Sequence, residues 1–124
     1  MVEDGIPAEL REFIANSIDS VGQLEALLLV RNNADQGWDA PQLARRLYVS
    51  ETEAAAILDH LVEQGFVTEQ NALYRYDRAG QQVAVIDEMA EVYTRQLIPI
   101  TQLIHEKPRQ IRAFADAFKI KRDK

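Results

Sequence analysis

The segment SETEAAAILDHLVEQGFV, residues 50–67, constrains the fold more than any other stretch of the chain. Its apolar residues recur at i, i+3, i+4, i+7 and i+8, which predicts an amphipathic helix with one buried face. Ser50, followed three residues later by Glu53, predicts a capping box at the helix start, and Gly65 is the residue type that commonly ends a helix. The face expected to be buried consists of Ala54, Ile57, Leu58, Leu61 and Val62.

A shorter helix is predicted immediately upstream. Asp39 has the position of an N-cap, with Pro41 in the first turn and Gln42 placed to complete a capping box. The side expected to be buried is Leu43, Ala44 and Leu47, whereas Arg45 and Arg46 face outward. Residues 48–50 make the turn between the two helices.

Downstream of the Gly65 stop the pattern changes. Residues 66–76, FVTEQNALYRY, are β-type residues around a polar Glu-Gln-Asn tip, which predicts a two-stranded hairpin. From about residue 78 to residue 104 the helical period returns, with a kink or break expected before Pro99. Pro108 then begins a final short helix with Ile111, Phe114, Ala115 and Phe118 on one face.

The N-terminal part is also predicted to be helical. A first amphipathic helix begins at Pro7, and a second begins near Ser20, which forms a possible capping box with Gln23. Residues 31–39 are a loop by composition, and Trp38 at its end is expected in the core. The apolar sets of the two helices are Leu10, Phe13 and Ile14 in the first, and Val21, Leu24, Leu27, Leu28 and Val30 in the second.

The order helix, helix, turn, helix, hairpin resembles a winged helix-turn-helix. LARRLYVSETEAAAILDHLVEQGFV is similar to the common pattern of that superfamily at Leu43-Ala44, Leu47, Val49-Ser50, Leu58, Leu61, Gly65 and Val67. With the added flanking helices the chain is most similar to multiple-antibiotic-resistance-regulator (MarR) type bacterial transcriptional regulators. The resemblance covers residues 20–76 and implies a mainly α fold, with a three-helix core and a two-stranded hairpin as the wing.

The chain departs from this pattern in two ways. Tyr48 occupies a turn position often held by a small residue, and the second helix of the motif carries four carboxylates between residues 51 and 64 with no Lys or Arg. Outward positions of this helix supply base contacts in winged-helix DNA readers, and here only Thr52 and His60 can donate hydrogen bonds. Acidic residues near phosphates oppose the attraction that provides most non-specific affinity.

Two functions therefore remain open for a transcription-regulator-like binding protein. In the first, double-stranded DNA is held mainly by the wing, by Arg45 and Arg46 and by a basic tail. In the second, the winged helix is a protein–protein interaction module, with transcription machinery as one candidate partner, because an acidic, Ala-rich face suits a basic protein. The candidate contact residues are Arg45, Arg46, Thr52, His60, Arg75, Arg78, Lys119, Lys121 and Arg122.

Charge is unevenly distributed along the chain, whose formal net charge is −6. Residues 1–104 hold 17 acidic and 7 basic side chains, whereas residues 105–124 hold 3 acidic and 7 basic ones. An acidic body with a basic tail predicts that any contact with a polyanion is local. A solvated, frayed C-terminus explains the same composition.

The 124 residues suffice for one domain, which divides into an N-terminal helix (1–18), a winged helix-turn-helix (19–77), C-terminal helices (78–118) and the tail (119–124). The apolar stripes of the flanking helices exceed what a domain of about 60 residues covers alone. A homodimer through residues 6–18 and 83–118 is therefore predicted. Its interface residues are Ile86, Met89, Tyr93, Leu97, Ile100, Phe114 and Phe118.

Catalytic and metal chemistry find little support. Cysteine is absent, and no glycine-rich phosphate loop, nucleophile elbow or metalloprotease helix occurs, so we expect neither an enzyme nor a cofactor or metal. His60 beside Asp59 and Glu63 is typical of a surface rather than of a metal site. The start lacks the layout of a secretory signal and the longest apolar run spans residues 26–30, far short of the roughly 20 residues that cross a bilayer. We expect a cytoplasmic protein without membrane contact.

Overall fold

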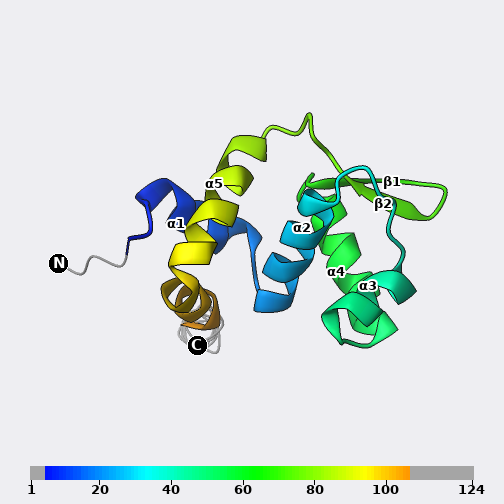
Figure 1. Ribbon diagram of the computed structural model, residues 1–124, viewed down its shortest axis with the longest axis horizontal. Coiled ribbons are helices and arrows are strands. Elements are labelled where there is room, and N and C mark those ends of the chain that lie inside the picture. Colours follow the sequence, from blue (N-terminus) through cyan, green and yellow to red (C-terminus); the bar gives the residue numbers. More distant parts are fainter. Residues whose placement is uncertain (1–4, 107–124) are drawn as a thin grey trace, which may run out of the picture.

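The computed structural model describes residues 5–106, which are mainly helical with one small antiparallel sheet. Figure 1 shows two groups of elements: α1 lies across α5, while α2, α3, α4 and the hairpin form the other group. The named elements are α1 (Ala8–Ser17), α2 (Val21–Asn32), α3 (Ala40–Leu47), α4 (Glu51–Glu63), β1 (Val67–Gln70), β2 (Leu73–Tyr76) and α5 (Val83–Arg95), and residues 97–106 are also helical.

The starts of α2, α3 and α4 follow the predicted caps. At α3 the capping box is complete, since the Asp39 carboxylate accepts from Gln42 N–H at 2.9 Å and the Gln42 side chain accepts from Asp39 N–H at 3.4 Å. At α2, Ser20 accepts from Gln23 N–H, but the Gln23 side chain accepts from Asp19 N–H, one residue earlier than predicted. At α4, Ser50 accepts from Glu53 N–H at 3.0 Å, which is the Ser50 half of the predicted box.

Helix α4 ends at Gly65 as predicted. Gly65 has φ +81°, its N–H donates to Val62 C=O, and Phe66 N–H donates to Leu61 C=O, both at 2.9 Å. These two bonds form a Schellman motif, which needs the left-handed conformation that glycine adopts without strain. The buried face is Ala54, Ile57, Leu58 and Leu61. Val62 is 38% exposed, so its predicted burial is wrong; it lies at the edge of the apolar face, beyond the arc covered by α2, α3 and β1.

The hairpin forms with a shorter tip than predicted. Gln70 pairs with Leu73, so Glu69 and Gln70 belong to β1 and the turn consists of Asn71 and Ala72. Both turn residues have positive φ, 56° and 64°, as in the type I′ turns that match the twist of paired strands.

Trp38 joins the hairpin to the loop before α3. Its backbone N–H and C=O pair with those of Tyr74 at 2.8 Å, which forms an isolated antiparallel β-bridge to β2. The side chain is 1% exposed, which confirms the prediction that it belongs to the core.

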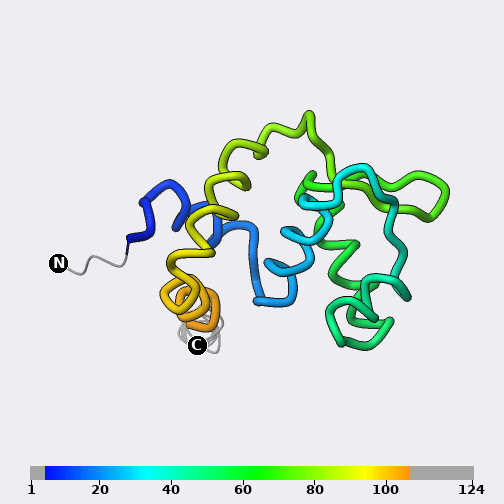
Figure 2. The backbone as a smooth tube through the Cα atoms, in the orientation of Figure 1, coloured from blue at the N-terminus to red at the C-terminus, as the bar shows by residue number. Residues whose placement is uncertain are grey.

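The predicted break before Pro99 is confirmed. Helix α5 ends at Arg95, Gln96 leaves the helical conformation (φ −125°, ψ 47°), and helical backbone resumes at residue 97 (Figure 2). Pro99 therefore stands in the first turn of the new helix, where a missing N–H costs no hydrogen bond.

One apolar core connects the two groups of elements. Phe13 of α1 and Phe66 at the end of α4 pack with ring centroids 5.5 Å apart, and Leu10, Ile14, Leu58 and Met89 are fully buried. Within residues 5–106 no single helix is long and apolar enough to cross a membrane; α1 and α2 reach that length only together, and they are bent by 106° at their junction.

Candidate functional site

The turn between α3 and α4 presents two arginines to solvent. Arg45 and Arg46 are exposed in the last turn of α3, as the sequence predicts. The Arg46 guanidinium lies 5.5 Å from the centroid of the Trp38 ring, a cation–π geometry that restricts the side chain without neutralising it.

Tyr48 follows directly and is the most exposed large hydrophobic residue of the described chain, at 93%. It is the C-cap of α3 and has φ 61° and ψ 45°, the left-handed conformation. Its backbone N–H and that of Val49 both reach the Ala44 carbonyl, which closes the helix. These backbone hydrogen bonds define the turn, although the Tyr48 side chain is not buried against any other residue in the range 5–106.

The outward face of α4 is acidic. Thr52, Asp59 and Glu63 are exposed, together with the alanines at 55 and 56, which agrees with the helical pattern. Asp59 also lies close enough to the hairpin for its charge, together with that of Glu69, to raise the pKa of Tyr74, after the larger effect of burial. Asp59 therefore lies on the part of α4 near the hairpin.

His60 is not on this outward face, which corrects its predicted position. Its Nε2 lies 2.7 Å from the Ser17 carbonyl oxygen, an acceptor, so the ring donates to the end of α1. The side chain is half-buried because position 60 lies on the flank of α4 next to the α1 terminus. Of Thr52 and His60, the two hydrogen-bond donors predicted for the outward face of α4, Thr52 is the exposed one.

The two hairpin arginines differ in their surroundings. Arg75 is exposed and its guanidinium lies against the loop before α3: a Cβ added to Gly37 would stand 3.2 Å from Arg75 Cζ. Arg78, just after the hairpin, binds Asp35 at 2.7 Å. Because both partners of that pair are highly exposed, the pair stabilises the fold by no more than about 1 kcal/mol, but it occupies the charge of Arg78.

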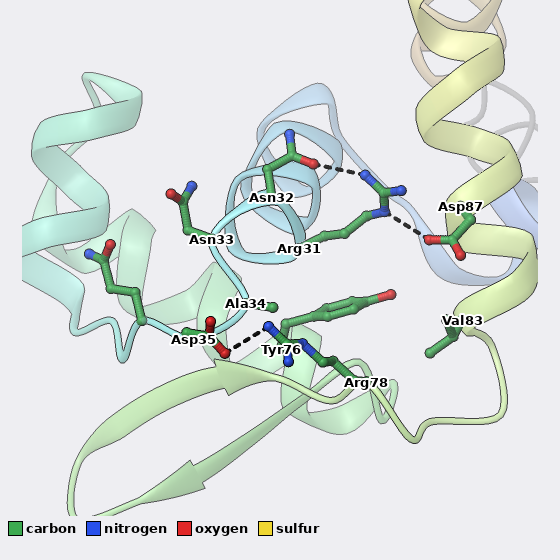
Figure 3. Close-up of a pocket in the computed structure, with 10 residues that line it drawn as sticks. Arg31, Asn32, Asn33, Ala34, Asp35, Tyr76, Arg78, Val83 and Asp87 are labelled. Atoms are coloured by element: carbon green, nitrogen blue, oxygen red, sulfur yellow. Dashed lines mark hydrogen bonds and ion pairs between the residues drawn. The ribbon is translucent and has the colours of Figure 1, made fainter.

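A groove of about 650 Å³ lies between the end of α2, the following loop, the hairpin and the start of α5 (Figure 3). Its charged lining consists of two ion pairs, Arg78 with Asp35 and Arg31 with Asp87, so its positive and negative charges balance. The Tyr76 ring crosses the groove with its hydroxyl pointing toward α5 (Figure 3). That hydroxyl is buried without a hydrogen-bond partner; burial first, and then the charge of Asp87, raise the Tyr76 pKa, while Arg31 opposes them.

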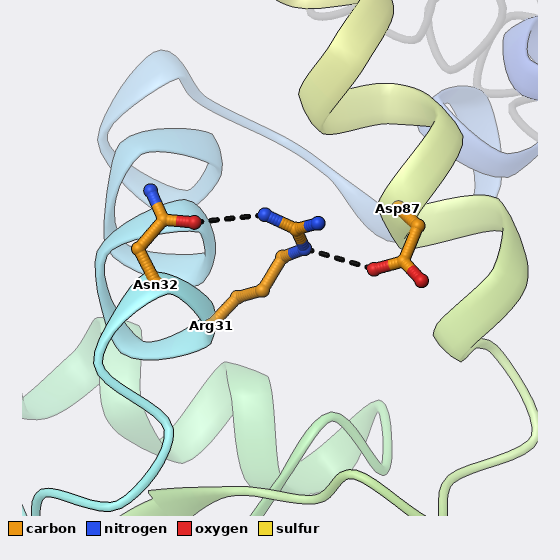
Figure 4. Close-up of polar contacts among 3 residues, drawn as sticks. All are labelled: Arg31, Asn32 and Asp87. Carbon is orange, nitrogen blue, oxygen red and sulfur yellow. Dashed lines mark hydrogen bonds and ion pairs between the residues drawn. The ribbon is translucent and has the colours of Figure 1, made fainter.

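Two polar contacts connect α2 to α5. Arg31 Nε donates to Asp87 at 2.9 Å while its Nη1 donates to Asn32 at 2.8 Å (Figure 4). The Tyr93 hydroxyl donates to Glu25 at 2.7 Å. Burial, followed by the hydrogen bond and charge of Glu25, raises the Tyr93 pKa to about 12, against a smaller opposing hydrogen bond from Thr101. Sequence reasoning missed both contacts, because residues 56 and 68 positions apart leave no periodic signal.

The predicted dimer surface is largely interior. Ile86, Met89, Tyr93 and Ile100 are at most 9% exposed within a single chain, so their side chains are already covered by other residues of the same chain. α5 packs against α1, which accounts for the apolar stripe that the prediction assigned to a partner. Leu97 is the exception, at 52% exposure, since it follows the break at Gln96.

Several predicted residues lie outside the described range of 5–106, namely Phe114, Phe118 and the tail residues Lys119, Lys121 and Arg122. Within that range no group of three or more His, Cys, Asp or Glu side chains is placed to hold a metal ion. Comparison with protein-family models and with curated proteins finds no match to this chain.

Proposed function

We propose that this chain is a winged helix-turn-helix DNA-binding protein of the transcription-regulator type, which contacts the duplex from the two sides of α4 rather than through α4 itself. The topology supports the fold assignment. α3 and α4 form a helix-turn-helix pair packed on α2, and Trp38, between α2 and α3, makes a β-bridge to the hairpin. The hairpin is the wing in this arrangement.

One observation carries the DNA assignment. Arg31, Arg78 and Arg95 each bind a carboxylate. Arg45, Arg46 and Arg75 form no ion pair with any residue in the range 5–106, and they lie on α3 and on the hairpin, which both pack against α4. Exposed arginines without carboxylate partners, on elements next to one helix, are suited to phosphate contacts that position a duplex.

Salt dependence of binding tests this assignment. Phosphate contacts release counterions, so log affinity falls linearly with log salt by about 0.9 for each neutralised phosphate. Replacing both Arg45 and Arg46 with Gln removes two exposed cations, and the slope for a labelled random-sequence duplex should fall by about 2. Arg95→Gln is the matched control, because Arg95 is an exposed arginine on α5 that binds Glu91. An unchanged slope in the double variant, or no duplex binding by the wild type at low salt, contradicts the assignment.

A second function is favoured by a different observation, the acidic face of α4. Asp59 and Glu63 are exposed and form no ion pair with another residue in the range 5–106. Glu51 and Glu53 stabilise the first turn through the helix dipole, by about 0.3–1 kcal/mol each, whereas these two carboxylates have no such structural role. A basic protein surface would pair with them.

Replacing Asp59 and Glu63 together with Ala separates the possibilities. If α4 lies near phosphates without reading bases, every duplex should bind more tightly, because repulsion is removed. If α4 reads sequence, the preference among duplexes should change. If α4 docks a basic protein, the double variant should bind that protein more weakly, and DNA binding plays no part in the function. Both side chains are exposed, so the stability should change by no more than about 0.5 kcal/mol.

A further inference from the structure

The Tyr48 side chain contributes nothing to the apolar core. It is 93% exposed at the turn between α3 and α4, so the apolar area of its ring remains in water. Burial of apolar surface is the main stabilising effect of an aromatic side chain, and here that effect is absent. The fold alone does not explain a tyrosine at this position.

The backbone at Tyr48 is also strained. Its φ of 61° and ψ of 45° place it in the left-handed region, where a Cβ crowds the following carbonyl and where glycine usually closes a helix. Strained residues of this kind concentrate at functional sites. An exposed side chain on a strained backbone indicates that the side chain itself is used.

The charges around Tyr48 define the kind of partner. Arg45 lies one helical turn before it and Arg46 two residues before it, both exposed, and the hydroxyl of a tyrosine is a common donor to phosphate oxygens. Glu51, in the first turn of α4, is the nearest acidic residue along the chain. A phosphate placed on the α3 side of the turn meets the two arginines rather than this carboxylate.

We infer that Tyr48 is a DNA-backbone contact residue, whose hydroxyl donates to a phosphate that Arg45 also approaches. The inference rests on the proposed DNA-binding function and extends it to an uncharged residue. Tyr48 therefore fixes the position of α3 on the duplex, while the arginines provide the long-range attraction.

The test compares Tyr48→Phe and Tyr48→Gly with the wild type in the full chain. Binding of a fluorescently labelled random-sequence duplex is measured between about 50 and 200 mM salt, together with the thermal midpoint. Both variants should bind about tenfold more weakly, the loss expected for one hydrogen bond to a charged group. The salt slope should not change, because no charge is removed.

Stability should move in the opposite direction from binding. Tyr48→Gly relieves the strained backbone without uncovering core, so its Tm should rise by a few degrees, whereas Tyr48→Phe keeps the backbone and should melt with the wild type. Ala72→Gly is a control for stability only: it relieves a left-handed residue at the hairpin turn (φ 64°), and should also raise Tm. Higher stability with weaker binding in Tyr48→Gly, and weaker binding without higher stability in Tyr48→Phe, support the contact.

Three results overturn the inference. If Tyr48→Phe binds as tightly as the wild type, the hydroxyl is not the contact. If Tyr48→Gly also binds as tightly, while the Arg45/Arg46 variant still lowers the salt slope, DNA binding stands and only the role of Tyr48 fails. If the wild type binds no duplex even at low salt, both the function and this contact are refuted.

Discussion

The hairpin turn provides a prediction of stability that depends on one atom. Ala72 has φ 64°, so its backbone is in the left-handed region. There the Cβ crowds the following carbonyl, at a cost of roughly 1–2 kcal/mol for an L-residue. The side chain is exposed, so removing it uncovers no core. Replacement by glycine eliminates the clash and produces the Asn-Gly sequence that type I′ turns favour most.

The gain is reduced by the unfolded state, because glycine has more conformations to lose on folding, at about 0.4–1 kcal/mol. Ala72→Gly should therefore stabilise the chain by about 0.5–1 kcal/mol, measured as an increase in the urea midpoint with no change in the m-value.

Asn71→Gly is the control at the neighbouring position. Asn71 also has positive φ, 56°, but asparagine tolerates this region, so the entropic cost should outweigh the relief and the variant should be neutral or slightly less stable. If Ala72→Gly gives no gain, or if the two variants gain equally, the strain assigned to Ala72 is wrong.

Three further predictions follow from burial, titration and charge. The pKa of Tyr93 is raised from 10 to about 12, so the stabilisation of the fold by the neutral Tyr93 side chain is complete below pH 10. That stabilisation is lost as the pH rises from 10 through 12, by up to about 1.4 kcal/mol per pH unit. In Tyr93→Phe the free energy of urea unfolding should therefore depend less on pH in that window. Met89 is fully buried within one chain, so Met89→Ala should lower the free energy of unfolding by about 2–5 kcal/mol, whereas Leu97→Ala should change it by about 0.5 kcal/mol or less. If sedimentation instead shows a stable dimer that Met89→Ala dissociates without unfolding the chain, the assignment of Met89 to the intramolecular core is wrong. Truncation before Lys119 removes four basic residues, and should lower the salt slope of duplex binding by up to about 4 with an unchanged thermal midpoint, whereas an unchanged slope would exclude the tail as a contact.

Local signals predicted most of the secondary structure. Asp39 with Gln42, Ser50 and Gly65 each act through hydrogen bonds within a few residues, so their roles are visible in sequence and are confirmed in the structure. Pro99 also acts locally, and the break before it occurs at Gln96. Such features need no knowledge of the tertiary arrangement.

Features that depend on distant partners were predicted less well. Periodicity identifies the apolar face of α5 but not what covers it, and α1 covers the stripe that was assigned to a second chain. His60 has an outward position by pattern, yet the end of α1 approaches its flank of α4 and provides the Ser17 carbonyl. Val62 was misassigned for the converse reason, because it stays 38% exposed among residues 5–106, at an edge of the helix that their other elements leave open.

These tertiary contacts give each side of α4 a different role. One flank contacts Ser17 through His60, another face is core, and the first-turn glutamates interact favourably with the helix dipole. Asp59 and Glu63 are exposed carboxylates on the outward face without such a role, and neither suits a phosphate. Arginines that α4 lacks are instead on α3 and β2, at Arg45, Arg46 and Arg75. A duplex held by those elements would need α4 only as a spacer, and in that role a carboxylate weakens binding uniformly without changing which sequence is bound.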